Sequence, residues 1–307
     1  MQNLRRLLPD LTVFERGWLS ANNMLFVSPQ GTALVDSGYC THAAQTLALL
    51  QGALQGRRLD LLVNTHLHSD HCGGNAALQT HYPALRTLIP PGEAPQIARW
   101  YSDALSYQST GQQCPRFTFS DSLRPGASVQ LGERWWHAHA APGHDPHSLL
   151  LFEPESRVLI SADALWENGF GVVFPEINGV AAFDEVAATL DLIESLNPLV
   201  VIPGHGSVFT DVGPALQRAR RRLEGFVTNP AKHTLYAAKA LLKFKLLELQ
   251  QLPYPEFEQW VLTTPCFTTL RQANTPLGSP EQWVEALSSE LERSGAARRE
   301  NGWIYNL

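Results

Sequence analysis

The chain has 307 residues, of which 44% are hydrophobic and 17% charged, so it can bury a sizeable core and global disorder is excluded. Its 23 basic and 29 acidic residues give a net charge of −6, which lacks the strongly basic footprint of a nucleic-acid-binding protein. No apolar run reaches the roughly 18 residues that a membrane-spanning helix needs.

The N-terminus and the cysteines indicate in which cellular compartment the protein is expected. The first ten residues contain Arg5 and Arg6 but no apolar stretch as long as that of a signal peptide. The four cysteines are widely spaced and form no CxxC pair, which favours reduced thiols. We therefore expect a cytoplasmic protein.

The first elements along the chain are a hairpin and a helix. Apolar runs rich in β-formers at 24–27 and 32–36 flank Ser28-Pro29-Gln30-Gly31, which predicts the hairpin. Residues 41–55 are predicted to form a helix that ends near Gly56.

The next stretch carries the chemistry. An apolar run at 59–64 predicts a buried strand, and Thr65-His66-Leu67-His68-Ser69-Asp70-His71 follows it directly. His66 and His68 are two residues apart, so an extended backbone points both the same way and they can bind one ion. Asp70 and His71 come after the chain turns, and they can face a second ion nearby. Imidazole and carboxylate are ligands that zinc, iron and manganese accept.

A surface loop that happens to hold histidines is the alternative to a metal site at 65–71. Four ligand-type residues within six positions argue against it.

The elements that follow, up to residue 226, alternate between strand and helix. Residues 106–125 are predicted to be irregular. The predicted helices up to residue 226 are 76–81, 93–105, 183–196 and 213–226, and the predicted strands are 86–89, 128–131, 135–140, 148–153, 157–162 and 199–202.

The C-terminal part is predicted to be a small separate domain. Thr228-Asn229-Pro230 is the expected boundary, which divides the chain into 1–228 and 229–307. Helices are predicted at 232–250 and 254–262, and a third begins at the capping box of Ser279 and Gln282. A hairpin around Asn301-Gly302 follows. Three helices and a hairpin are typical of a winged-helix-like module.

Five motifs in order resemble those of the metallo-beta-lactamase superfamily over about the first 225 residues. They are Leu34-Val35-Asp36-Ser37-Gly38, the motif 65–71, Ala141-Pro142-Gly143-His144, Ser161-Ala162-Asp163 and Pro203-Gly204-His205-Gly206. The resemblance implies an α/β (α+β) fold, the αββα metallo-beta-lactamase sandwich, followed here by the small C-terminal helical, winged-helix-like domain.

The resemblance also implies a ligand set for two divalent metal ions. His66, His68 and His144 would hold the first ion. Asp70, His71 and His205 would hold the second, and Asp163 would bridge the two. Zinc is the expected metal, with iron or manganese as alternatives. A metal-bound hydroxide would attack the substrate, and Asp70 or metal-bound water would protonate the leaving group.

Residues around these ligands are candidates for the substrate pocket. They are His147, Trp166, Phe170 and Phe174. Asp36 is interpreted either as an acceptor that orients a ligand histidine or as a turn-capping residue. Lactonase relatives carry a tyrosine where Trp166 stands, which argues against a lactone substrate. The commonest beta-lactamases carry a cysteine where Asp163 stands, which favours the thioesterase, lactonase and phosphodiesterase branches.

The predicted function is hydrolysis of a small ester, thioester or lactone, as in the glyoxalase II-like group of the superfamily. A metal-dependent phosphodiesterase or ribonuclease, a mononuclear iron persulfide dioxygenase and a non-catalytic binding protein are the alternatives. The expected partner is a small-molecule substrate, with no nucleic acid and no membrane. The tail is expected to shape the pocket or a homodimer interface.

Overall fold

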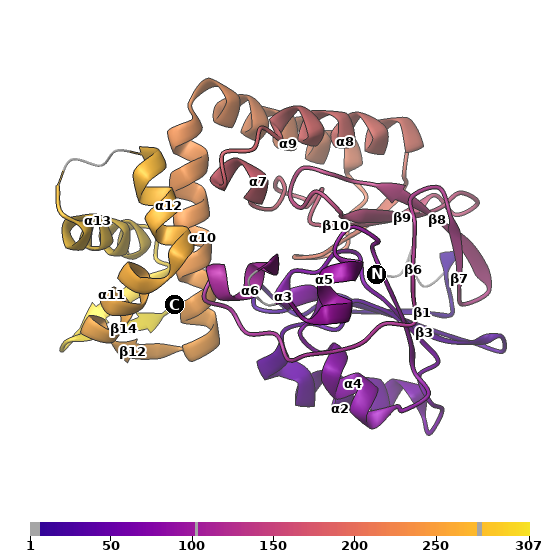
Figure 1. The fold of residues 1–307 in the computed structure, drawn as a ribbon. Coiled ribbons are helices and arrows are strands. Elements are labelled where there is room, and N and C mark those ends of the chain that lie inside the picture. The colour runs from indigo at the N-terminus through magenta and orange to yellow at the C-terminus, as the bar shows by residue number, and fades with distance from the viewer. Residues whose placement is uncertain (1–6, 102–103, 275–277) are drawn as a thin grey trace.

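The computed structural model describes residues 7–101, 104–274 and 278–307. Its centre is two β-sheets packed face to face, with helices on both outer faces (Figure 1). The first sheet comprises β1 (Leu11–Phe14), β2 (Asn23–Ser28), β3 (Gly31–Val35), β4 (Leu61–Val63), β5 (Arg86–Ile89) and β6 (Asp121–Ser122), in that order. The second runs β11 (Val200–Pro203), β10 (Val158–Ala162), β9 (Leu149–Glu153), β8 (Arg134–Ala140) and β7 (Ser128–Leu131).

Alternation along the strands explains the four layers. Successive side chains of a strand point to opposite faces of its sheet. On β2, Met24 and Phe26 therefore pack between the sheets, while Leu25 packs outward against helices α2 (Ala43–Leu54) and α4 (Asn75–His81). The outer face of the second sheet packs on α8 (Phe183–Leu196) and α9 (Val212–Thr228). The predicted αββα sandwich is confirmed.

Several predicted boundaries were wrong, because tertiary contacts decide where these elements begin and end. The helix predicted at 93–105 is α5 (Ala94–Arg99), which ends because Trp100 takes a left-handed backbone with φ 52°. Residues 102–103 of that prediction lie outside the described residues. The stretch predicted as irregular, 106–125, holds the short helix α6 (Ser106–Ser109) and β6. Strand β6 forms only because it pairs with the end of β5.

Four short elements were not predicted. They are β1, the 3-10 turn η1 (Cys40–His42), and the helices α3 (Ser69–Cys72) and α7 (Phe174–Ile177). Helices α3 and α7 are single turns, too short for a periodic apolar pattern to reveal. Helix α3 holds Asp70 and His71, and α7 begins at the predicted pocket residue Phe174, so the shape of the site was less predictable than its composition.

The C-terminal part builds its own core around a long helix. It comprises α10 (Pro230–Leu249), β12 (Gln251–Pro253), α11 (Tyr254–Thr263), α12 (Pro265–Asn274), α13 (Pro280–Arg293), β13 (Ala297–Glu300) and β14 (Trp303–Asn306). The Ser279 capping box and the terminal hairpin are as predicted. Strand β12 and helix α12 were not predicted, and β12 makes the hairpin a three-stranded sheet. The domain boundary and the winged-helix likeness stay predictions.

Two further expectations concern the chain as a whole. Among the described residues, none of the helices is both long and apolar enough to cross a membrane. Residues 1–6, which hold most of the segment on which the absence of a signal peptide was judged, lie outside the described residues.

His233 links helix α10 to the sandwich and its outer helices. It is buried near the start of α10, its Nε2 accepts a hydrogen bond from the Val173 backbone N–H (3.1 Å), and its ring contacts Phe183 and Phe226. Burial lowers the pKa of His233 from 6.5 to about 4. The folded protein therefore holds His233 in its neutral form, because only the neutral ring offers a lone pair to the Val173 N–H.

We expect His233 to weaken the fold in acid. Because its folded pKa lies below the unfolded value, the stabilisation is complete above pH 6.5 and is lost as the pH falls toward 4. The loss should reach about 3 kcal/mol of unfolding free energy. The unfolding free energy of His233→Gln, measured with denaturant, should fall less steeply between pH 7 and 4 than that of the parent. His137→Gln, at an exposed position, should keep the parent slope. Equal slopes in all three proteins would contradict this role.

Candidate metal centre

The motif after β4 forms a loop that turns into α3. Strand β4 lies in the interior of its sheet, so its end delivers Thr65 and the residues after it to the edge of the sandwich. His66 and His68 lie on the loop, and Asp70 and His71 lie within the single turn of α3. All three histidines of the motif are buried.

The remaining candidate ligands come from the second sheet. His144 lies between β8 and β9, Asp163 follows β10, and His205 follows β11. At the end of β10 the register shifts, and Ala162 has φ 46°, a conformation that non-glycine residues rarely adopt. This irregularity turns Asp163 into the site. Gly204 passes against the Asp163 carboxylate, where a Cβ would collide with Oδ1.

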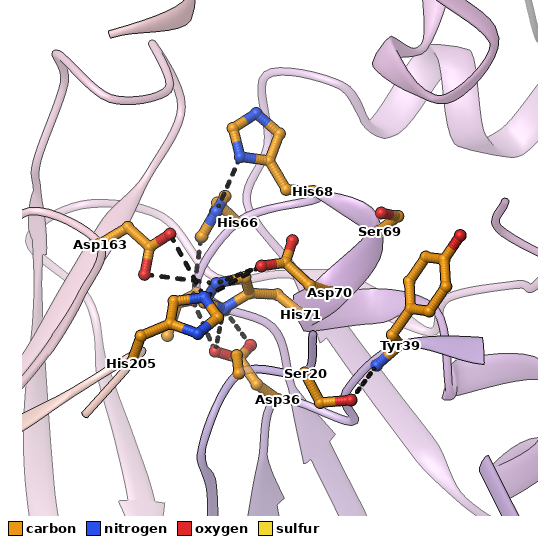
Figure 2. A network of polar contacts seen from close by, with 12 residues as sticks. Ser20, Asp36, Tyr39, His66, His68, Ser69, Asp70, His71, Asp163 and His205 are labelled. Carbon is orange, nitrogen blue, oxygen red and sulfur yellow. Dashed lines mark hydrogen bonds and ion pairs between the residues drawn. The ribbon is translucent and has the colours of Figure 1, made fainter. Parts of the chain in front are cut away.

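The seven side chains form two adjoining groups. In the first, His66 Nε2 lies 3.1 Å from His68 Nδ1, which lies 2.8 Å from His144 Nε2. The second group comprises Asp70, His71, Asp163 and His205, and there His205 Nε2 lies 3.0 Å from Asp70 Oδ2. Figure 2 shows most of these side chains pointing toward one another.

Asp163 faces both groups. Its Oδ1 lies 3.5 Å from His71 Nε2 and its Oδ2 lies 3.4 Å from His144 Nε2. The Trp166 indole N–H donates to Oδ1 at 3.1 Å, which holds the carboxylate in this orientation. An aspartate so placed can bind two ions at once.

Hydrogen bonds outside the groups set which nitrogen faces the site. The carbonyls of Val172 and Gly17 can only accept, so the His144 and His205 rings donate to them from Nδ1 (2.6 and 3.1 Å). His71 Nδ1 lies 2.8 Å from Asp36 Oδ2. In each ring Nε2 is then free to bind a metal.

Asp36 is held in place by the motif itself. Its carboxylate accepts from the Thr65 backbone N–H (2.9 Å) and from the Thr65 hydroxyl (2.8 Å). The orienting role proposed for Asp36 matches this geometry. The turn-capping alternative fits less well, because the three hydrogen-bonding contacts of the carboxylate among the described residues lead to Thr65 and His71.

The donor set fits a pair of cations. His71 Nε2 is buried and has no hydrogen-bond partner among the described residues. A neutral His205 that donates from Nδ1 presents a lone pair at Nε2. That nitrogen nevertheless lies 3.0 Å from Asp70 Oδ2, which is also an acceptor. Two acceptors this close need a proton or a cation between them. The cluster is therefore suited to binding a metal pair.

The electrostatics of the cluster agree with this. Burial, with the neighbouring imidazoles, lowers the pKa of His66 well below its ordinary value and that of His144 to about 4. For His71 burial acts in the same direction, but Asp163, Asp36 and Asp70 raise its pKa well above 6.5. Burial would raise the pKa of Asp163, yet His205 and His71 hold it well below its ordinary value. For His205, too, burial lowers the pKa, but Asp163 and Asp70 raise it above its ordinary value. The carboxylates thus favour positive charge on His71 and His205, and a metal pair would take the place of those protons, because a metal binds neutral imidazoles.

A cavity of about 470 Å³ opens on the two groups. Five of the seven candidate ligands line it, and the others are His66 and His71 behind them. Its remaining walls are Trp18, Gln112, Trp166, Glu167, Asn168, Gly171, Val172, Phe174, Gly206, Ser207, Arg222, Tyr236, Ala240, Leu241, Lys243, Phe244 and Leu247.

Two of the four predicted pocket residues line this cavity. Trp166 and Phe174 do, and the Phe174 ring lies 4.6 Å from the His68 ring. His147 does not, because its exposed side chain lies against Gly92, beyond the cavity wall. Phe170 does not either, because its buried ring packs on Phe226 in the core.

Two other parts of the wall were not predicted residue by residue. Trp18 is 54% exposed and stacks on the His205 ring, with centroids 5.4 Å apart and planes at 6°. It precedes the first predicted hairpin and belongs to no motif. The second part is one face of α10. The tail was expected to shape the pocket or a homodimer interface, but none of its residues was predicted to line the wall.

Comparison with known proteins places this site in a family. A family model described as the metallo-beta-lactamase superfamily matches residues 16–205. The chain is 30% identical over 168 residues to a hydroxyacylglutathione hydrolase of Stenotrophomonas maltophilia, covering 54% of this chain and 53% of that protein. It is 26% identical over 225 residues to a nitric oxide reductase of Moorella thermoacetica, covering 66% and 53%. These matches span about half the length of either relative.

Other similarities extend further along the chain. The acyl-coenzyme A thioesterase MBLAC2 of Homo sapiens is 26% identical over 219 residues, covering 62% of this chain and 74% of that one. A solved metallo-beta-lactamase family protein of Thermus thermophilus has the same fold, with a TM-score of 0.56 at 21% identity over 98% of this chain and all of the other. The protein TTHA1623, solved in a di-iron-bound form, has a TM-score of 0.55 at 26% identity, covering 68% and 98%.

We expect Asp163→Ala to lose metal. Removing the carboxylate that faces both groups should lower the bound metal from about two ions per chain to about one or fewer. Elemental analysis of protein purified without chelator measures this. Asp191→Ala, an exposed aspartate on α8, should keep the parent content. Two tightly held ions in Asp163→Ala would show that this side chain is not a ligand.

We also expect Asp36→Asn to weaken metal binding without removing a ligand. Asp36 accepts with both oxygens, one from the Thr65 N–H and the other from the Thr65 hydroxyl and His71. Asparagine has a single acceptor oxygen, so either Thr65 or His71 then meets an N–H group and the ring is held less well with Nε2 toward the metal. Loss of such an outer partner typically costs roughly 10–100-fold in metal affinity. Competition with a chromophoric chelator gives the affinity, and Asp191→Asn serves as the matched control. Unchanged affinity would contradict the orienting role.

Proposed function

The chain belongs to the metallo-beta-lactamase superfamily, and from this premise we propose that it is a binuclear metal-dependent hydrolase of a small thioester or ester. The observation that supports this most directly is the pair of adjoining ligand groups with Asp163 facing both, on the wall of a cavity large enough for a substrate. A bound metal pair supplies a hydroxide at neutral pH and polarises the carbonyl of the substrate.

The side chains of the cavity have distinct tasks in this proposal. His66, His68 and His144 hold one ion, and Asp70, His71 and His205 hold the other. Asp70 lines the cavity, so its carboxylate can take the proton of the attacking water at an oxygen and pass it to the leaving group. Trp18 and Phe174 cover the ligands with apolar surface and exclude bulk water.

The position of Trp166 favours a thioester over a lactone as the substrate. Its N–H is engaged by Asp163 Oδ1, so it is not free to donate to a substrate carbonyl as a tyrosine hydroxyl would. A good thiolate leaving group needs less protonation than an alkoxide, which suits a site where Asp70 is the side chain placed to deliver a proton. The names of two relatives, a hydroxyacylglutathione hydrolase and an acyl-coenzyme A thioesterase, support the same bond.

Several finer predictions stay predictions beside this one. Zinc is our proposed metal, and the di-iron form of a structural neighbour keeps iron as the alternative. The phosphodiesterase, the persulfide dioxygenase and the binding protein remain the rival functions. A cytoplasmic location and a homodimer are proposals that rest on the sequence.

We expect the metal-loaded protein to hydrolyse thioesters faster than phosphodiesters. The assay compares S-lactoylglutathione, acetyl- and decanoyl-N-acetylcysteamine, a homoserine lactone and bis(p-nitrophenyl) phosphate, with thiol release or product followed for each. Chelator treatment should abolish turnover and added zinc should restore it. Faster cleavage of the phosphodiester would favour that rival, and oxygen uptake with glutathione persulfide by protein holding a single iron would favour the dioxygenase.

A further inference from the structure

Helix α10 presents two apolar faces. One face is buried in the C-terminal core against α12 and α13, and its residues are Ala237, Ala238, Leu241, Leu242 and Leu246. Leu249, the last residue of the helix, is exposed. Since a helix needs only one such face to dock, the second calls for another explanation.

The second face belongs to the cavity. Tyr236, Ala240, Phe244 and Leu247 follow one another at helical spacing, are only partly buried, and line the cavity wall. Figure 1 shows α10 between the other C-terminal helices and the sandwich, with α6 and α7 beside it. The family model ends at residue 205, so this wall comes from a part of the chain that it does not cover.

The apolar wall is continuous with the metal ligands. Val172 and Phe174 line the cavity from the loop after β10. The Val172 carbonyl accepts from His144, and the Phe174 ring contacts the His68 ring. A substrate whose carbonyl reaches the ligands can therefore extend its apolar part along Phe174 toward α10.

The cations on this side are already engaged. Lys243 Nζ donates to the Ala296 carbonyl (2.8 Å) and to Asn306 Oδ1 (2.6 Å), so only its alkyl stem is offered to the cavity. The Arg222 guanidinium donates to the Phe170 carbonyl and lies 5.2 Å over the Tyr236 ring. Lys243 is therefore not placed to bind a polar acyl substituent at the α10 wall, and Arg222 is held against the Tyr236 ring.

The position of the wall is fixed from the catalytic side. The Phe244 ring meets the buried ring of Tyr39 edge-on, with centroids 5.0 Å apart. The Tyr39 hydroxyl in turn donates to Glu248 Oε1 (3.2 Å) and accepts from the Gln113 backbone N–H (3.0 Å). This bracing holds α10 at a set distance from the metal ligands.

We propose that Tyr236, Ala240, Phe244 and Leu247, with Val172 and Phe174, form an acyl-binding subsite that selects thioesters carrying a long apolar acyl chain. The proposal rests on the proposed function, because it takes the hydrolysed bond to lie at the metal ligands. Methylene groups leaving water for this wall favour binding in proportion to their area. A short hydroxylated acyl group would leave the wall in contact with water, so it is the poorer substrate.

Two variants of α10 test the subsite. Ala240→Phe fills the wall, whereas Lys232→Phe places the same ring at an exposed position of the same helix. The substrates are acetyl-, hexanoyl- and decanoyl-N-acetylcysteamine, which differ only in the acyl chain. The non-hydrolysable thioethers S-ethyl- and S-decyl-N-acetylcysteamine report binding by calorimetry without turnover. Metal content and thermal unfolding confirm that each variant is folded and loaded.

We expect the parent and Lys232→Phe to prefer decanoyl over acetyl by about tenfold or more in kcat/KM, and to bind the decyl thioether correspondingly more tightly. Ala240→Phe should lose both preferences while keeping its metal content, and Lys232→Phe should keep the parent's acetyl turnover. No chain-length preference in the parent, or one that survives in Ala240→Phe, would overturn the subsite and leave the hydrolase intact. Preferential binding of the decyl thioether without turnover of any thioester would instead overturn the hydrolase.

Discussion

The carboxylate of Asp163 is the constraint on which the site depends. It is buried, and its two oxygens face imidazole nitrogens that come from different sheets: His71 follows a strand of the first, and His144 follows one of the second. A buried anion among buried imidazoles is costly unless positive charge compensates it, so the arrangement makes physical sense as a cation site. Packing of the two sheets sets how closely these groups approach.

The loops that carry the ligands are held rigidly by buried polar side chains. Asn22 donates from Nδ2 to the carbonyls of Pro203 and Gly206, on either side of His205. Ser37 and Asn64 donate to the His71 carbonyl, and Asn75 completes that network. Because these buried groups are paired with one another, the ligand positions are set before any ion binds.

The C-terminal part contributes to the site through one helix. Helix α10 closes the cavity with its second apolar face, and His233 at its first turns holds the backbone at Val173, next to the carbonyl that orients His144. The candidate metal ligands and one wall of the cavity thus come from different parts of the chain. This division lets a metal site common to a family serve different substrates by changing what packs against it.

The sequence by itself predicted most regular elements and the clustered histidines and aspartates after the strand at 59–64, because these depend on local features: alternation along strands, periodicity along helices and a dense run of ligand-type residues. The sandwich fold and the candidate ligand set were predicted from the resemblance of five motifs to a known family. Only the tertiary structure decided which side chains surround the ligands. It put Trp18 on His205 and α10 against the cavity, and it left His147 and Phe170 outside. These contacts join segments that are far apart in the chain. They form because side chains are buried together in the folded protein, and a local sequence pattern does not show which distant segments meet.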